Sequence, residues 1–145
     1  MPGHKTHERV GLLCTPLLFP LTQWLHLSID QSIFFSITYL VANYFITPDL
    51  DTDSMPYHRW GLFRIFWWPY KRYIPHRSWL SHSSIISGTL RFLYLLLPFV
   101  VGMLWIPVHD PLRFLPYIGI LWMSIILVDT LHVVLDSCFS DRHRI

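Results

Sequence analysis

The segment Asp129-Thr-Leu-His-Val-Val-Leu-Asp136 closes a long apolar run that begins near Tyr117, which predicts the last two turns of a helix. At about 100° per residue, Asp129, His132 and Asp136 fall within roughly 60° of one another on that helix. Two carboxylates and an imidazole on one face of an apolar helix each need a polar partner if the face is buried. A divalent metal would satisfy all three, because zinc and related ions bind Asp and His. A hydrogen-bonded polar core or a solvated helix end would account for the same stripe.

The composition indicates a chain that meets lipid. Its 145 residues are 52% hydrophobic and 17% aromatic but only 14% charged, whereas a soluble domain carries about 25% charged residues. The length suits a single domain, residues 1–145. Two cysteines are too few for a disulfide framework. A net charge of +2 is too small to indicate nucleic acid by itself, whereas nine histidines beside eleven Lys and Arg favour a histidine site.

Four apolar runs divide the chain. Residues 10–29 and 31–48 contain no Asp, Glu, Lys or Arg and are separated only by Asp30, which predicts an antiparallel hairpin. The third run covers residues 84–106, with Arg91 expected to reach the lipid interface by snorkelling, and the fourth covers residues 112–135. Each approaches the ~20 residues that span a hydrocarbon core. The predicted fold is an all-α bundle of about four membrane-embedded helices, with a soluble two-layer helical fold as the alternative.

Residues 49–84 form one long polar segment between the second and third runs. Five Lys and Arg side chains are interleaved there with nine Trp, Phe and Tyr side chains. This mixture is typical of a segment at the headgroup level of a membrane. Single-stranded nucleic acid selects similar residues, but the apolar flanks favour membrane lipids as the partner, and no nucleic acid is expected.

The basic residues predict an orientation. With four spans, the N-terminus, residues 49–84 and the C-terminus share one side, and nine of the eleven Lys and Arg lie in those three parts. The excess of positive charge marks the cytoplasmic side of a membrane protein. We therefore expect an integral membrane protein whose polar clusters gather near the cytoplasmic face.

Histidines and aspartates from four separate segments are expected to meet at that end, as in metal sites built inside helix bundles. The predicted metal ligands are His7, Asp49, His76, His82, Asp129, His132 and Asp136. Two of the clusters also suit a role without metal. Asp49 and Asp51 are typical of a turn or a helix cap, and His76 and His82 are typical of an interface with headgroups. Ser83 is expected to cap the third helix.

Several of these residues carry a family resemblance. Thr6-His7, Pro48-Asp-Leu-Asp51, the segment from His76 to Ser83, and the stripe ending at Asp136 resemble a small bacterial membrane family described as metal-binding proteins of unknown function. The pattern is similar, more distantly, to membrane-bound metal-dependent hydrolases and to the zinc-dependent phospholipase C and single-strand nuclease superfamily. That resemblance implies one or two zinc ions. The positions that match best are His7, Asp49, His82, His132 and Asp136.

The resemblance also implies a reaction. The leading hypothesis is a metal-dependent hydrolase of a phosphoester, either a small phosphate-containing molecule or a lipid-linked substrate. Asp51, with Asp49 and Asp129 as alternatives, is expected to take a proton, and Arg77 or Arg59 to pair with the phosphate. The alternative is a non-catalytic metal-binding membrane protein, such as a sensor, carrier or assembly factor. A purely structural membrane subunit, without metal, is the third hypothesis.

Overall fold

The computed structural model describes residues 4–75, 78, 83–103, 105 and 110–140, and within them it is all-helical, which confirms the all-α class. The described residues form six α-helices, whereas about four were predicted. The α-helices are α1 (His4–Trp24), α2 (Ile29–Phe45), α3 (Met55–Arg59), α4 (Arg64–Tyr73), α6 (Ser84–Met103) and α7 (Leu115–Ser140). Short 3-10 helices join them, namely η1 (Pro48–Asp51), η2 (Gly61–Phe63) and η3 (Pro111–Phe114).

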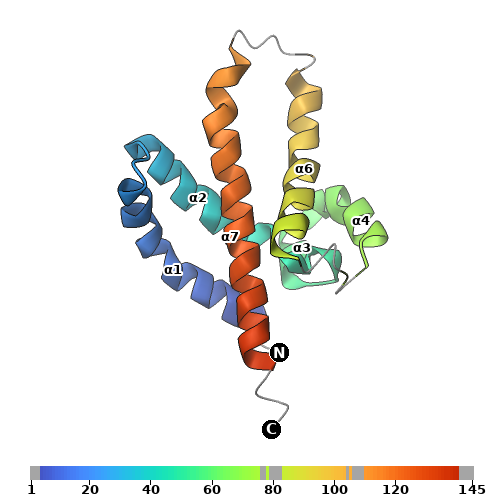
Figure 1. Ribbon diagram of the computed structural model, residues 1–145. Helices are drawn as coiled ribbons and strands as arrows, with labels where there is room; N and C mark the ends of the chain where they lie inside the picture. Colours follow the sequence, from blue (N-terminus) through green and yellow to red (C-terminus); the bar gives the residue numbers. More distant parts are fainter. Residues whose placement is uncertain (1–3, 76–77, 79–82, 104, 106–109, 141–145) are drawn as a thin grey trace.

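Helix α7 is the central element. The α1–α2 hairpin packs on one flank of α7 and α6 packs on the other (Figure 1). The start of α1 and the end of α7 lie together at one end of the molecule, and α6 and α7 reach the opposite end (Figure 1). The elbow between α1 and α2 stops short of that opposite end, so this hairpin is shorter than the pair formed by α6 and α7.

Local signals fix the α1–α2 hairpin. His26 turns the chain with a positive φ of 61°, a conformation that His adopts more readily than most residues. Ser28 then caps α2 and forms a reciprocal capping box with Gln31. Nearer the open end, a Cβ at Gly11 would lie only 2.1 Å from the Asn43 side chain. The two helices therefore approach closely only because residue 11 is glycine.

Proline and serine shape the segment that follows α2. Pro48 lies at the start of η1, and its preceding residue Thr47 is extended, which ends the α-helix. The Ser54 side chain accepts a hydrogen bond from the Tyr57 amide and so caps α3. Trp67 of α4 is fully buried against other aromatic rings. The core therefore continues beneath the basic and aromatic segment.

The prediction that Arg91 snorkels to the interface is wrong. Its side chain is fully buried and forms an ion pair with Asp129, which is also fully buried. The α6–α7 contact is tight at this level, because a Cβ at Gly88 would lie 2.9 Å from Asp129 Oδ2. The Asp129 carboxylate, one helical turn before His132, is therefore the partner of the Arg91 guanidinium, which was expected to reach the membrane interface instead.

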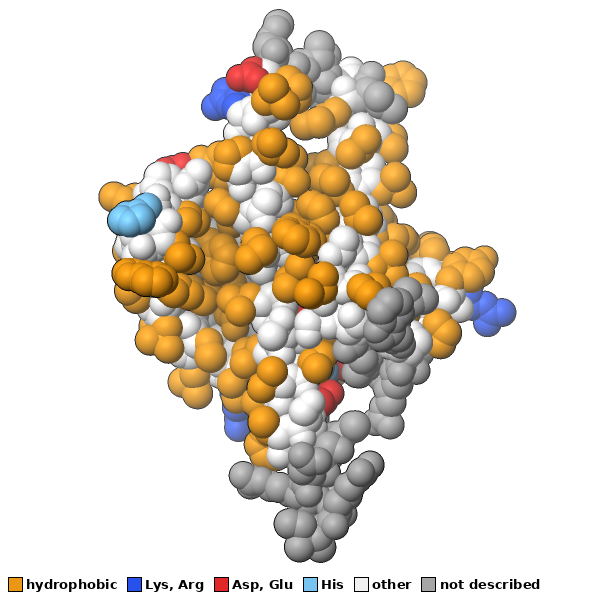
Figure 2. Space-filling model, viewed as in Figure 1, with side chains coloured by type: hydrophobic (Ala, Val, Ile, Leu, Met, Phe, Trp, Pro, Cys, Tyr) orange, Lys and Arg blue, Asp and Glu red, His pale blue; other side chains and the backbone are white. Residues whose placement is uncertain are grey.

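Three helical stretches within the described residues are long and apolar enough to cross a membrane: Ile29–Asp51, Ser84–Met103 and Pro111–Phe139. Helix α1, which covers most of the first predicted run, is not among them, because its first two turns carry Lys5, Glu8 and Arg9. Large apolar side chains such as Leu13, Leu93 and Leu97 are more than half exposed. Hydrophobic side chains cover much of the face shown in Figure 2, with most charged groups toward its edges.

Candidate metal centre

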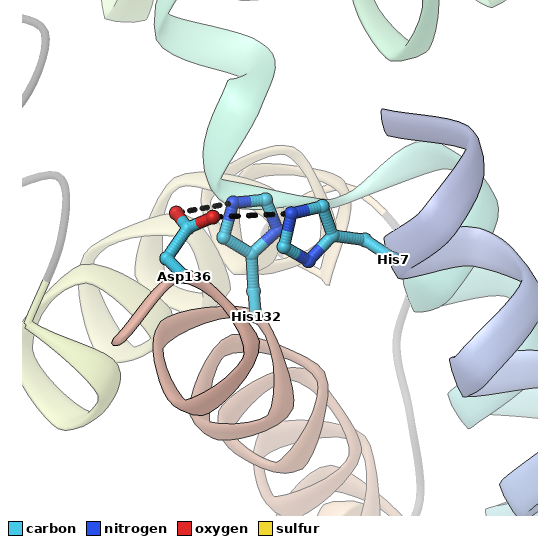
Figure 3. Close-up of side chains that lie close together, drawn as sticks. All are labelled: His7, His132 and Asp136. Atoms are coloured by element: carbon cyan, nitrogen blue, oxygen red, sulfur yellow. Dashed lines mark ion pairs between the residues drawn. The ribbon is translucent and has the colours of Figure 1, made fainter. Parts of the chain in front are cut away.

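His7, His132 and Asp136 lie together where α1 crosses the end of α7 (Figure 3). His7 Nε2 is 3.2 Å from Asp136 Oδ1, and His132 Nε2 is 3.5 Å from Asp136 Oδ2. Both imidazoles are at least nine-tenths buried, and the Asp136 side chain is 18% exposed. One turn of α7 places His132 and Asp136 on the same face, as their spacing of four residues requires.

Asp49 of η1 lies beside this group, next to His132. Its Oδ1 lies 3.8 Å from His132 Nε2. In a tetrahedral zinc site, bonds of about 2.0–2.1 Å place neighbouring ligand atoms about 3.3 Å apart. The three separations between donor atoms, 3.2, 3.5 and 3.8 Å, are close to that value. His7, His132 and Asp136 thus bring two imidazoles and a carboxylate within 4.8 Å of one another, a group that could hold a divalent ion, with Asp49 next to His132.

The two imidazole rings of this group lie against each other. The His7 and His132 rings are stacked, with centroids 3.9 Å apart and planes inclined by 13°. Two protonated rings so close would repel each other, so protonation can balance only one of the two carboxylates cheaply. His7 Nδ1 is buried and makes no hydrogen bond to any described residue. A divalent ion bound to neutral imidazoles would balance both carboxylates.

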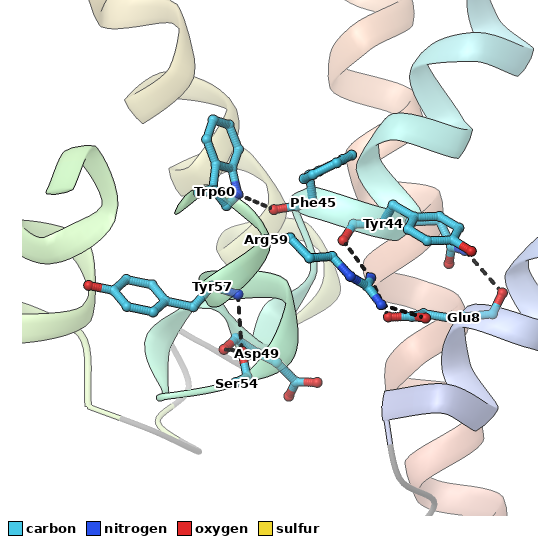
Figure 4. A network of polar contacts seen from close by, with 9 residues as sticks. Glu8, Tyr44, Phe45, Asp49, Ser54, Tyr57, Arg59 and Trp60 are labelled. Carbon is cyan, nitrogen blue, oxygen red and sulfur yellow. Dashed lines mark hydrogen bonds and ion pairs between the residues drawn. The ribbon is translucent and has the colours of Figure 1, made fainter. Parts of the chain in front are cut away.

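A second network holds α1 in place beside this group (Figure 4). Arg59 donates to both carboxylate oxygens of Glu8, the residue after His7, at 2.5 and 3.0 Å. The same guanidinium donates to the Tyr44 carbonyl at 3.1 Å, and the Asn43 amide donates to the Glu8 carbonyl at 3.1 Å. The start of α1 is therefore tied to α2 and α3. The sequence did not predict the Glu8–Arg59 pair, since no periodicity connects residues 51 positions apart.

The remaining predicted site residues have different surroundings. Asp129 is paired with Arg91 and is not part of the His7, His132 and Asp136 group. Asp51 is buried at the end of η1 and lies within electrostatic range of Arg91. Arg59, expected as a phosphate ligand, is engaged by Glu8. His76, Arg77 and His82 lie outside the described residues, whereas Ser83 accepts a hydrogen bond from the Ile86 amide and caps α6 as predicted.

A histidine–carboxylate pair on the surface of the protein can be compared with this buried group. His58 Nε2 lies 3.3 Å from Asp53 Oδ1 on the surface, where the Asp53 side chain is 70% exposed. A hydrogen bond and the charge of Lys71, with a smaller effect of His58, hold the pKa of Asp53 below its ordinary value. Here a lysine already supplies the positive charge. The buried group differs because no Lys or Arg among the described residues forms an ion pair with Asp49 or Asp136.

The fold and the site together define a helical protein with a candidate histidine–carboxylate metal site. The chain belongs to the family described as "Uncharacterized metal-binding protein (DUF2227)", whose model matches residues 2–116. The match includes His7 and Asp49 but ends before His132 and Asp136. In the tertiary structure, His132 and Asp136 lie beside His7 and Asp49 of the matched part.

The curated relative is a protein of Aquifex aeolicus (strain VF5) described only as an uncharacterized protein. It is 33% identical over 67 residues, which cover 46% of this chain and 47% of the relative. The aligned part thus spans about half the length of each protein. No solved structure matches the chain significantly.

Proposed function

We propose that this protein is a membrane-embedded metal-binding protein that holds a divalent cation, with zinc the best fit, between His7, Asp49, His132 and Asp136. The observation that carries the proposal is the convergence of His7, His132 and Asp136, whose donor atoms lie within 4.8 Å of one another, with Asp49 Oδ1 3.8 Å from His132 Nε2. Mixed nitrogen and oxygen donors suit zinc better than calcium or magnesium, which prefer oxygen alone.

The membrane part of the proposal rests on the distribution of apolar surface. Three stretches have the length and composition of spans, and many large apolar side chains are exposed while the charged side chains of Arg91 and Asp129 are buried. In η2 and α4, Leu62, Phe63 and Ile65 are at least 75% exposed beside Arg64. Lipid acyl chains and headgroups would cover this apolar and basic mixture. The metal site would then face the cytoplasm, on the basic side of the protein.

For the activity we propose hydrolysis of a phosphoester, from a small molecule or a lipid. When bound, the ion would supply Lewis-acid stabilisation of charge on a phosphoryl oxygen. Asp51, two residues after Asp49, is the proposed proton acceptor, and Arg77 is the proposed partner of the phosphate. This activity rests on the resemblance, whereas metal binding rests on the geometry.

A non-catalytic role as a metal sensor, carrier or assembly factor is the second candidate. The specific observation in its favour is that Asp49 lies beside the group of His7, His132 and Asp136 as a possible fourth donor, since structural zinc sites fill four positions and catalytic sites keep one open. The Asp49 donor is the most distant of them, at 3.8 Å from His132. An Asp49→Ala variant that still binds zinc and still hydrolyses substrate would favour the catalytic form of the site.

Elemental analysis of the purified protein tests metal binding directly. We expect about one equivalent of zinc per chain, and loss of most of it in His132→Ala and His7→Ala. The matched control is His58→Ala, which removes an exposed imidazole that also faces a carboxylate. Equal metal content in all four proteins would contradict the proposal.

Hydrolysis is tested separately. The protein in detergent or in vesicles is incubated with a chromogenic phosphodiester and with a phospholipid, before and after chelation. We expect turnover that chelator abolishes and zinc restores. Bound zinc with no turnover of either substrate would leave the non-catalytic role as the function.

A further inference from the structure

A cavity of about 460 Å³ lies between the closed end of the α1–α2 hairpin and α7. In Figure 1 this is the region between the elbow of the hairpin and the upper half of α7. The α7 wall of the cavity is one helical stripe, made of Pro116, Gly119, Ile120, Met123 and Leu127. Eleven residues separate the ends of this stripe, so the wall extends about 16 Å along the helix. The cavity is therefore elongated.

The cavity has a buried floor and an open mouth. Thr22 of α1 and Ile120 of α7 are only 2% and 9% exposed, whereas Leu21, Leu25 and Met123 are about half exposed. Beside Gly119 the space is empty, because a Cβ added there would meet no described atom within 4 Å. The glycine therefore leaves room in the wall that a larger side chain would fill.

The chemistry of the lining indicates what kind of ligand the cavity accepts. None of the described residues that line it is charged or is a histidine. Its two polar side chains bond within the hairpin, since the Thr22 hydroxyl donates to the Phe19 carbonyl at 2.8 Å and Gln31 Oε1 accepts from the Ser28 amide at 3.1 Å. A polar ligand would lose its hydrogen bonds to water without replacement. A hydrocarbon chain loses none, and the volume is within the about 300–1,000 Å³ typical of ligand sites.

Two of the three helices around the cavity, α2 and α7, lie in the candidate spans Ile29–Asp51 and Pro111–Phe139. Resting on the membrane part of the proposed function, we propose that the cavity binds one acyl chain of a membrane phospholipid, held between α1, α2 and α7. In a bilayer, acyl chains already surround the half-exposed apolar rim. Gly119 is 13 residues from His132, about 20 Å along α7, so this site is separate from the metal site.

Photo-crosslinking in vesicles tests the proposal on the full chain. The protein is reconstituted in phosphatidylcholine that contains a small fraction of phosphatidylcholine with a diazirine in one acyl chain, and the adducts are located by mass spectrometry. Surrounding lipid can reach exposed positions such as Leu93 and Leu97 of α6, but it reaches Thr22 and Ile120 only if a chain enters the cavity. We expect adducts at all four positions.

Gly119→Phe should fill the cavity and lose most of the adducts at Thr22 and Ile120, while the α6 adducts persist. Gly102→Phe is the matched control, because an added Cβ there also meets no described atom within 4 Å and the residue does not line the cavity. It should keep the adducts at the floor. Met123→Trp, at the half-exposed rim, should cause the same loss as Gly119→Phe and replaces it if that variant does not fold.

The outcomes separate this inference from the proposed function. Adducts on α6 with none at the floor of the cavity would overturn the inference and leave the membrane proposal standing. Floor adducts that persist in both Gly119→Phe and Met123→Trp would also overturn it, because the labelled chain would not occupy this cavity. The absence of adducts at the floor and on α6 alike would instead overturn the membrane part of the proposed function.

Discussion

Arg59 of α3 holds Glu8 of α1 through two hydrogen bonds of 2.5 and 3.0 Å, and Glu8 directly follows His7. The pair is partly buried, with side-chain exposures of 23% and 12%, and Arg59 also covers the Tyr44 ring. Charge-assisted contacts of this two-pronged geometry are both strong and directional. The pair therefore fixes the end of α1 at the point where His7 reaches α7.

Arg59→Met tests this role. The substitution leaves the Glu8 carboxylate partly buried without its partner, and we expect a loss of about 1–3 kcal/mol in the free energy of unfolding. Because His7 is adjacent, Zn²⁺ affinity should fall about tenfold. Denaturation in detergent and zinc titration measure the two effects. Arg72→Met, at a largely exposed position of α4, is the control and should change neither quantity.

Gly11→Ala should destabilise the α1–α2 hairpin. The new methyl group would lie 2.1 Å from Asn43 Oδ1, so the helices must separate or Asn43 must release the Glu8 carbonyl. We expect a loss of about 1–3 kcal/mol in the free energy of unfolding. At Gly119 of α7 no described atom lies within 4 Å of an added Cβ. Gly119→Ala should therefore stabilise the protein by about 0.5–1 kcal/mol, and equal effects at the two glycines would refute the close approach.

Trp67→Ala should remove the anchor of α4. Trp67 is fully buried and contacts the rings of Trp60, Tyr70 and Tyr94, so truncation should cost about 3–5 kcal/mol. The neighbouring Trp68 is 56% exposed, and Trp68→Ala should change the free energy of unfolding by about 0.5 kcal/mol or less. Thermal melts followed by near-UV circular dichroism separate the two. A large effect at Trp68 alone would mean that α4 is rotated.

Leu93→Lys tests the membrane proposal. Leu93 lies near the middle of α6 and is 54% exposed, so in a bilayer the lysine would face lipid at a cost of about 2.5–3.5 kcal/mol for insertion. We expect less protein in the membrane fraction of expressing cells. Leu62→Lys, at a 93% exposed position of η2, should be tolerated because that segment is proposed to lie at the interface. If both variants fractionate like the unaltered protein, α6 does not cross lipid.

The all-helical fold could be predicted because its signals are local. Apolar runs, the stop at Pro48 and the cap at Ser83 each act within a few residues. The turn expected at Asp30 falls earlier, at His26, and Asp30 lies in the first turn of α2. The three ligands predicted on α7 do not all reach the same site. His132 and Asp136 lie beside His7, whereas Asp129 forms an ion pair with Arg91. All three share one stripe in the sequence. Which neighbouring helix each of them meets depends on packing.

The sequence by itself determined the long apolar runs that become helices and which face of the last one carries carboxylates and an imidazole, because both follow from interactions over a few residues. Only the tertiary structure decided that His7 stacks on His132, that Glu8 binds Arg59 and that Arg91 is buried against Asp129. These contacts join residues between 38 and 125 positions apart. Their geometry depends on how α1, α6 and α7 approach one another, and that approach is set by side-chain packing over the whole core.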